Sequence, residues 1–254
     1  MQAAQINSRW SDISDATALG YFERNAGKYA EWTRASRGFH ERLAVFGGLV
    51  ACCCPAPGEH PVCLDLGCGN AALGSLAAAR GFDVTAIDGS ARMLTLARQA
   101  QAHGTDRQIR DFRHAPLPLA PALIGEFHGR AELIIASSVI EYLSAAHARK
   151  LLAQCAQLLA PGGTALISFP NRRALYWRAQ RLIGARGPLR ANVSALQQQQ
   201  WTPEQVRETA RACGLRVDRI EYFALPFQQR LDRLPLGRPR WLATLFVTTL
   251  VATG

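Results

Sequence analysis

The chain has 254 residues, 48% of them hydrophobic, and a formal net charge of +10. This length and apolar content fit one domain, or one domain with appendages, and exclude global disorder. The basic excess is almost all arginine, since lysine occurs only at Lys28 and Lys150. It is compatible with an anionic substrate or an acidic partner protein and does not by itself indicate nucleic acid.

The cysteine pattern bears on metal binding and compartment. Three of the seven cysteines are consecutive at 52–54, and no CxxC pair occurs. This spacing suits neither a zinc site nor a disulfide framework, so we expect reduced thiols, no metal and a cytoplasmic protein. Residues 1–10 show no signal-peptide pattern, and the apolar run 242–251 is too short to span a bilayer.

In chain order, two N-terminal helices are predicted, over 14–34 and 39–54, before a Pro-Ala-Pro-Gly break. Strands and helices then alternate. The predicted strands are 62–66, 83–88, 109–112, 132–137, 163–169, 215–223 and 242–251, and the helices between them are 71–80, 90–102, 144–159 and 203–213. The alternation up to residue 169 indicates βαβ units and a parallel sheet, which a basic helix over 172–183 interrupts.

Residues 62–72 are the most informative stretch, because they predict a buried strand, a glycine turn and a helix start. Gly67 and Gly69 allow positive φ and a close ligand approach, and the helix directs free N–H groups at that ligand. Asp88 follows 21 residues after Gly67, at the end of the next strand. An acid at this spacing can hold a nucleotide ribose, so the pattern indicates a nucleoside-cofactor site.

The choice of cofactor depends on the residues around the turn. Gly67-x-Gly69-x-x-Ala72 also fits the dinucleotide fingerprint, so NAD(P) has to be considered. A buried acid at Asp65 would repel a pyrophosphate but suits an ammonium group, and Met93 offers an apolar surface to an adenine. The sequence also contains no Tyr-x-x-x-Lys hydride-transfer set.

Four motifs resemble the class I S-adenosylmethionine-dependent methyltransferases, in family order over about residues 60–170. They are Leu64-Asp-Leu-Gly-Cys-Gly69, Asp88-x-Ser-x-x-Met-Leu94, Ser138-Val-Ile-Glu-Tyr-Leu143 and Leu158-Leu-Ala-Pro-Gly-Gly163. The chain looks most like the small-molecule branch, whose members often start with a Phe/Tyr-containing helix.

The resemblance implies a fold and a domain plan. We expect an α/β, Rossmann-like, mostly parallel seven-stranded sheet with an antiparallel last strand and helices on both faces. We further expect an N-terminal helical lid over 1–58 and a methyltransferase domain over 59–254, with a substrate-side insertion at about 170–200.

The resemblance also implies S-adenosylmethionine as the cofactor and a role for each matching residue. Asp65, Gly67 and Gly69 would hold the methionine end, and Asp88 would accept both ribose hydroxyls. Further cofactor residues would be Met93 against adenine, Ser137 and Ser138 beside the sulfonium, and Tyr29 over the methionine.

Two positions depart from the family pattern. Ala71 stands where a third turn glycine is common, and we expect the start of a helix to tolerate it. His114 stands where an acid usually contacts the adenine amino group, so we expect the Ala115 backbone to select adenine instead.

The expected reaction needs no obligatory general base. An acceptor oxygen, nitrogen or carbanion attacks the methyl group in line, and the protein supplies alignment and desolvation. Tyr142 replaces the histidine most common at its position. The candidates for a catalytic group are His114, Glu141 and Tyr21, and the candidates for the acceptor side are Tyr21, Phe22, Asn171 and Tyr176.

Other hypotheses stay open beside a small-molecule acceptor. A nucleic-acid methyltransferase, for example one acting on RNA, is disfavoured because 137–140 reads Ser-Ser-Val-Ile rather than Asp/Asn-Pro-Pro-aromatic. An acceptor on an acidic carrier protein would dock on the arginines of 172–181. A non-catalytic module that binds the cofactor and regulates a partner would also have the glycine turn and Asp88.

Overall fold

The computed structural model describes residues 15–53, 59–102, 109–176, 196–224 and 241–253. Seven strands form one sheet in the order β3-β2-β1-β4-β5-β7-β6. Their bounds are β1 Val62–Leu66, β2 Asp83–Asp88, β3 Asp111–His114, β4 Ala131–Ala136, β5 Leu159–Pro170, β6 Leu215–Phe223 and β7 Leu245–Ala252. Neighbouring strands are parallel except at β7, which is antiparallel to both β5 and β6. The predicted fold class is confirmed.

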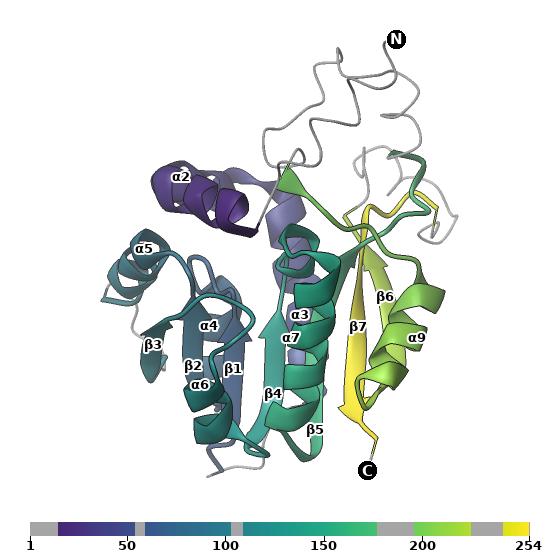
Figure 1. Ribbon diagram of the computed structural model, residues 1–254. Coiled ribbons are helices and arrows are strands. Elements are labelled where there is room, and N and C mark those ends of the chain that lie inside the picture. The colour runs from purple at the N-terminus through teal and green to yellow at the C-terminus, as the bar shows by residue number, and fades with distance from the viewer. Residues whose placement is uncertain (1–14, 54–58, 103–108, 177–195, 225–240, 254) are drawn as a thin grey trace.

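Helices cover both faces of this sheet (Figure 1). They are α2 Asp15–Ala35, α3 Arg37–Ala51, α4 Ala72–Ala78, α5 Ala91–Ala102, α6 Pro121–Phe127, α7 Ala145–Leu158 and α9 Pro203–Ala212, with a 3₁₀ turn, η1, at Ile140–Tyr142. Helix α9 begins at Pro203, as predicted, and Thr202 and Gln205 form a reciprocal capping box at its start. Within the described residues, no helix is long and apolar enough to cross a membrane.

Alternating strand residues build two apolar cores. Leu64 and Ile134 belong to the core beneath α6, α7 and α9. Cys63 and Leu133 belong to the core beneath α3, α4 and α5. Because side chains alternate along a strand, Asp65 lies on the same face as Cys63, toward α4.

The two N-terminal helices have different places in the fold. Phe46 and Val50 of α3 are fully buried in the second core, so α3 is one of the layers that cover the sheet. Helix α2 lies across the carboxyl ends of the strands, above α5 (Figure 1). Only α2 therefore has the position of a lid, and the domain boundary at 58 stays a prediction.

Sequence and structure differ in two local places, and a third prediction is not tested. The sequence predicts no helix between the strands at 109–112 and 132–137, but this stretch contains α6, which begins at Pro121 in the favoured first helical position. Strand β5 begins at Leu159 and runs through the Pro-Gly-Gly run expected to precede it, because Leu159 already pairs with Ala131. The basic helix expected over 172–183 lies mostly outside the described residues.

The expected insertion leaves and rejoins the sheet at one point. Asn171 forms an isolated bridge with Trp201, and the Trp201 amide donates to Pro170 O at 2.9 Å. The segment between them therefore starts and ends at the carboxyl end of β5, the edge where ligands bind in open α/β sheets.

Candidate functional site

The glycine turn after β1 has the conformation that its residues require. Gly67 and Gly69 have φ of +67° and +55°, and Ala71 has φ of +56°. A Cβ on Gly67 would lie 2.5 Å from Val139 Cγ2, closer than any real contact. Ala71 thus occupies a left-handed conformation directly before α4, at a cost of about 1–2 kcal/mol relative to glycine.

Asp65 is a buried carboxyl at the base of this turn. It is 2% exposed, and its Oδ2 accepts a hydrogen bond from the Gly74 amide at 2.9 Å. Burial is the main cause that raises the pKa of Asp65 to about 7, and the charge of Asp88 acts in the same direction. The hydrogen bond from the Gly74 amide lowers the pKa. A Cβ on Gly74 would lie 2.8 Å from Asp65 Oδ2, so the close approach of the Asp65 carboxyl to α4 requires glycine at position 74. A cation is the ligand that would stabilise such an acid.

Asp88 is fixed from both sides at the end of β2. Its Oδ2 accepts from the Gly69 amide at 2.8 Å and its Oδ1 from the Ser90 amide at 2.7 Å. Each oxygen keeps a second lone pair, so the carboxylate is oriented and could still accept two hydroxyl groups. Burial raises the pKa of Asp88, whereas the hydrogen bonds from Ser90 and Gly69 lower it.

The residues expected around adenine lie beyond Asp88. Met93 is buried at the start of α5, and exposed His114 pairs with Asp88 in the ladder, its Nε2 lying 2.9 Å from Gly89 O. The Ala115 amide donates to Asp88 O at 3.0 Å. Of the Ala115 backbone, therefore, only the carbonyl group can serve a ligand.

The two serines after β4 differ in their contacts. Ser138 has φ of +55°, and its amide donates to Ser168 Oγ at 2.8 Å. Ser137 lines the same pocket as Asp65 and Gly67, and its Oγ has no hydrogen-bond partner within the described residues. The structure therefore places Ser137 beside the glycine turn, and its role near the sulfonium stays a prediction.

Two acids, which sequence reasoning missed, hold α2 over this site. Glu23 Oε2 accepts from Ser90 Oγ at 2.6 Å and from the Arg92 amide at 3.3 Å, at the start of α5. Asp15 Oδ1 accepts from the Ser144 amide at 2.8 Å at the start of α7, and its Oδ2 pairs with His147. Both carboxylates thus lie at helix N-termini, where the helix dipole favours them.

Aromatic side chains form the inner surface of α2. Phe22 contacts Tyr21, Tyr29 and Tyr142 edge to face, with ring centroids 5.6, 5.8 and 5.1 Å apart. Burial raises the pKa of the Tyr29 hydroxyl. Tyr21, Phe22, Tyr29 and Tyr142 therefore form one aromatic cluster, and the acceptor and cofactor roles of the first three stay predictions.

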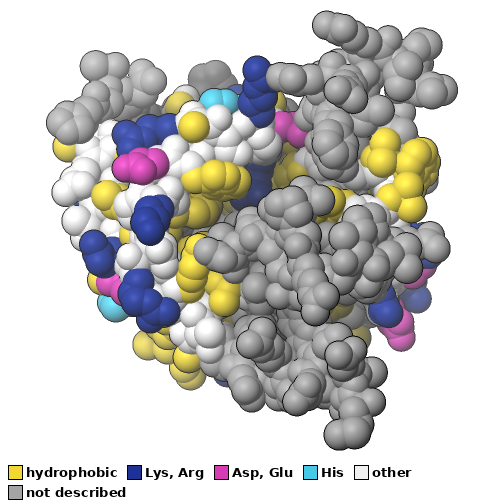
Figure 2. Space-filling view, turned by 90° about the horizontal axis from the view of Figure 1, so that it is seen from above, with side chains coloured by type: hydrophobic (Ala, Val, Ile, Leu, Met, Phe, Trp, Pro, Cys, Tyr) yellow, Lys and Arg dark blue, Asp and Glu magenta, His cyan; other side chains and the backbone are white. Residues whose placement is uncertain are grey.

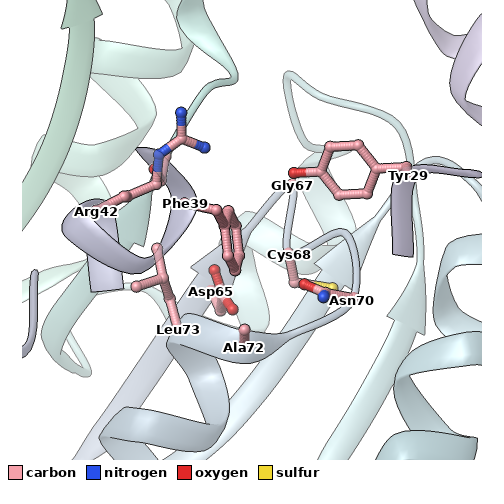
Figure 3. Close-up of a pocket in the computed structure, with 10 residues that line it drawn as sticks. Tyr29, Phe39, Arg42, Asp65, Gly67, Cys68, Asn70, Ala72 and Leu73 are labelled. Atoms are coloured by element: carbon pink, nitrogen blue, oxygen red, sulfur yellow. The ribbon is translucent and has the colours of Figure 1, made fainter. Parts of the chain in front are cut away.

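Arg42 is the cation of the pocket, and nothing in an arginine-rich sequence distinguishes it. It is 8% exposed, and its Nε has no hydrogen-bond partner in the described part of the chain. Figure 3 shows Arg42 and Phe39 entering from α3 and Tyr29 from α2, with the Asp65 carboxyl between them. The pocket thus presents a carboxylate and a guanidinium together, a pairing that suits an amino acid zwitterion.

One predicted acceptor residue, Asn171, lies in a different cavity. The buried Asn171 donates through Nδ2 to Ala243 O at 2.8 Å and accepts from the Arg173 amide at 3.0 Å. It lines a separate cavity of about 220 Å³, with Arg173, Arg207 and Trp241. Tyr176 lies at the end of a described segment, so its role stays a prediction.

Comparison with known proteins assigns the central part of the chain. Residues 64–165 match the family model of a methyltransferase domain. The glycine turn and Asp88 both lie within the matched residues. The magnesium protoporphyrin IX methyltransferase of Synechocystis PCC 6803, solved with bound SAH, has a similar fold, with a TM-score of 0.64, 18% identity and coverage of 94% of this chain and 99% of that one.

Curated relatives match over part of their length. The chain is 35% identical over 135 residues to the ubiquinone biosynthesis O-methyltransferase of Caulobacter vibrioides, covering 53% of this chain and 50% of the relative. It is 32% identical over 156 residues to the malonyl-[acyl-carrier protein] O-methyltransferase of Serratia marcescens, covering 61% and 53%. The chain thus spans about half the length of these relatives.

Proposed function

We propose that this protein transfers a methyl group from S-adenosylmethionine to a small-molecule acceptor. The observation that carries the proposal is the single pocket holding Asp65, Arg42 and the glycine turn, beside the oriented Asp88 carboxylate. When bound, S-adenosylmethionine supplies an electrophilic methyl group on a sulfonium.

Each of these residues has a role that its chemistry supports. Asp65 would accept the cofactor's ammonium group and Arg42 would bind its carboxylate. Asp88 would accept the ribose hydroxyls, with Met93 and the Ala115 carbonyl group at the adenine. Ser137 and the aromatic residues of α2 would exclude water from the reacting centre.

Cofactor entry requires α2 to move. The pocket beneath it encloses only about 20 Å³, the volume of roughly one water molecule, whereas ligand pockets measure roughly 300–1,000 Å³. Tyr29 helps to close the pocket, since its ring lies 3.4 Å from the point that a Cβ on Gly69 would occupy. We infer that α2 is a lid that opens at its Asp15 and Glu23 contacts.

Calorimetric titration with S-adenosylhomocysteine tests the binding half of this proposal. Asp88→Asn should weaken binding about 10- to 100-fold, because the charge-assisted hydrogen bonds to hydroxyl groups are lost. Unchanged affinity would remove Asp88 from the site. Transfer of a labelled methyl group to any acceptor would then exclude the non-catalytic module.

The acceptor class is supported by the site and by the relatives. Tyr21, Phe22 and Tyr142 offer apolar edges over the cofactor turn, which suit a flat, apolar acceptor. The Caulobacter relative is named for O-methylation in ubiquinone biosynthesis. We therefore favour a phenolic hydroxyl, and we keep the cytoplasm as the proposed location.

A carrier-bound acceptor is the second candidate, because one relative acts on a malonyl-[acyl-carrier protein]. Arg173 and Arg207 line the 220 Å³ cavity beside the 52% exposed Trp241, a surface that suits an acidic partner. Acyl carrier protein should then bind at low salt and lose affinity on Arg207→Glu. Lack of binding would leave the free small molecule as the acceptor. Arg178 and Arg181, which belong to the predicted docking face, lie outside the described residues.

A further inference from the structure

The turn after β4 contains a buried carboxyl group, one oxygen of which is unpaired among the described residues. Glu141 is 1% exposed, and its Oε2 has no hydrogen-bond partner within residues that the structure describes. Buried polar atoms are nearly always paired, so an unpaired carboxylate oxygen requires an explanation.

Asp65 and Asp88 are held by backbone amides, as expected of groups that orient a ligand. The Glu141 carboxyl accepts hydrogen bonds from its own amide and from Ser138, and Oε2 is left without a partner in the described residues. Ser137 Oγ and Arg42 Nε also have no hydrogen-bond partner in the described part of the chain, and both residues line the cofactor pocket. Arg42 and Tyr29, which line this pocket, interact electrostatically with Glu141, so the Glu141 carboxyl lies beside the pocket.

The surroundings of Glu141 fix its position. Its carbonyl oxygen accepts from the Gln198 amide at 2.6 Å, and the neighbouring Tyr142 ring packs on Phe22. Burial raises the pKa of Glu141, whereas its own backbone amide, Arg42 and Ser138 lower it. A raised pKa makes this carboxylate a stronger base than an exposed glutamate. Burial also raises the pKa of Tyr142 well above its ordinary value, which leaves Glu141 as the basic group of the turn.

We propose that Glu141 accepts the proton of an acceptor hydroxyl, an inference that rests on the methyl transfer of the proposed function. As the oxygen–methyl bond forms and the sulfur–methyl bond breaks, the hydroxyl proton moves to Glu141 Oε2. The acceptor becomes a neutral ether and the sulfonium sulfur a neutral thioether. The carboxylic acid then releases its proton to solvent.

Glu141→Gln tests this role, because glutamine keeps the size and loses the basic oxygen. With catechol, which is un-ionised at neutral pH, kcat should fall about 10²- to 10³-fold. With 4-nitrocatechol, which is largely ionised and needs no base, kcat should stay within a few-fold of wild type. Glu41→Gln, a charge-matched change on α3 beside Arg42, should leave the ratio between the two acceptors unchanged.

Calorimetry with S-adenosylhomocysteine separates this inference from the proposed function. The Glu141→Gln protein should bind it as wild type does, which also shows that the variant folds. Equal losses of kcat with both phenols would assign Glu141 a structural role and overturn the inference. So would a wild-type protein that binds S-adenosylhomocysteine but methylates neither phenol. Wild type that fails to bind it would overturn the proposed function itself.

Discussion

Cofactor affinity should depend on pH through Asp65. Burial places the pKa of this carboxyl at about 7, and an ammonium group binds only its ionised form. The ionised fraction is about one tenth at pH 6 and about three quarters at pH 7.5, so the affinity should rise about eight-fold over this range. Above about pH 8 the cofactor's own α-amino group loses its proton and the affinity should fall again.

Asp65 should also make the stability of the protein depend on pH, but stability should fall where cofactor affinity rises. The pKa of this carboxyl is about 4 in the unfolded chain and about 7 in the folded protein. The folded protein therefore loses stability as the pH rises from about 4 to about 7. The difference between 3.8 and about 7 corresponds to about 4 kcal/mol, as an upper bound. Asp65→Asn should therefore stabilise the protein at pH 7.5 and leave it nearly unchanged at pH 4.

The assay is calorimetric titration with S-adenosylmethionine between pH 6 and 7.5, paired with thermal unfolding. Asp65→Asn should bind at least ten-fold more weakly at pH 7.5 and lose the pH dependence. The matched control is His114→Gln, which removes the histidine beside Asp88 and should leave the slope unchanged. A flat wild-type profile, or the same slope in Asp65→Asn, would refute the role assigned to Asp65.

Three further substitutions test the turn and the lid. Gly67→Ala should destabilise the fold by about 2–4 kcal/mol in denaturant titration, because its φ is +67° and the new Cβ would lie 2.5 Å from a valine methyl group. Gly74→Ala should cost about 1–3 kcal/mol by pressing on Asp65, whereas Gly48→Ala, where nothing lies within 4 Å, should be neutral or stabilising. Asp15→Asn should speed amide hydrogen exchange over 15–35 at unchanged global stability, and unchanged exchange would argue against the lid contact.

The order of elements could be predicted because each one carries its own local signals. Alternating apolar strands, the glycine turn and the Thr202 capping box each depend on residues within a short window, and the structure contains all of them. Helix α6 was missed because its prolines at 116, 118 and 121 indicate a loop, although Pro121 starts a helix. The start of β5 was missed because its pairing with β4 is a contact between distant segments.

The same distinction applies to the site. That Asp65, Gly67, Gly69 and Asp88 lie together could be predicted, because their spacing follows from one strand–turn–helix unit and its neighbour. The place of Arg42 in the same pocket as Asp65 could not be predicted, because it depends on how α3 packs against α4. The lid contacts of Asp15 and Glu23 span 129 and 67 residues, and no local pattern encodes a contact at that separation.

Net charge is the composition feature that describes this site least well. The chain carries +10 with only 19 acidic residues, which by itself favours an anionic ligand. Yet burial raises the pKa of the Tyr29 hydroxyl, and Asp88, Glu141 and Asp65 raise it further, whereas Arg42 lowers it. Three carboxyl groups and one guanidinium thus act on this point of the pocket, a set of charges that suits a ligand carrying a sulfonium and an ammonium group beside a carboxylate. After transfer the sulfur is neutral, so the same three acids hold the product less tightly than the cofactor and favour its exchange.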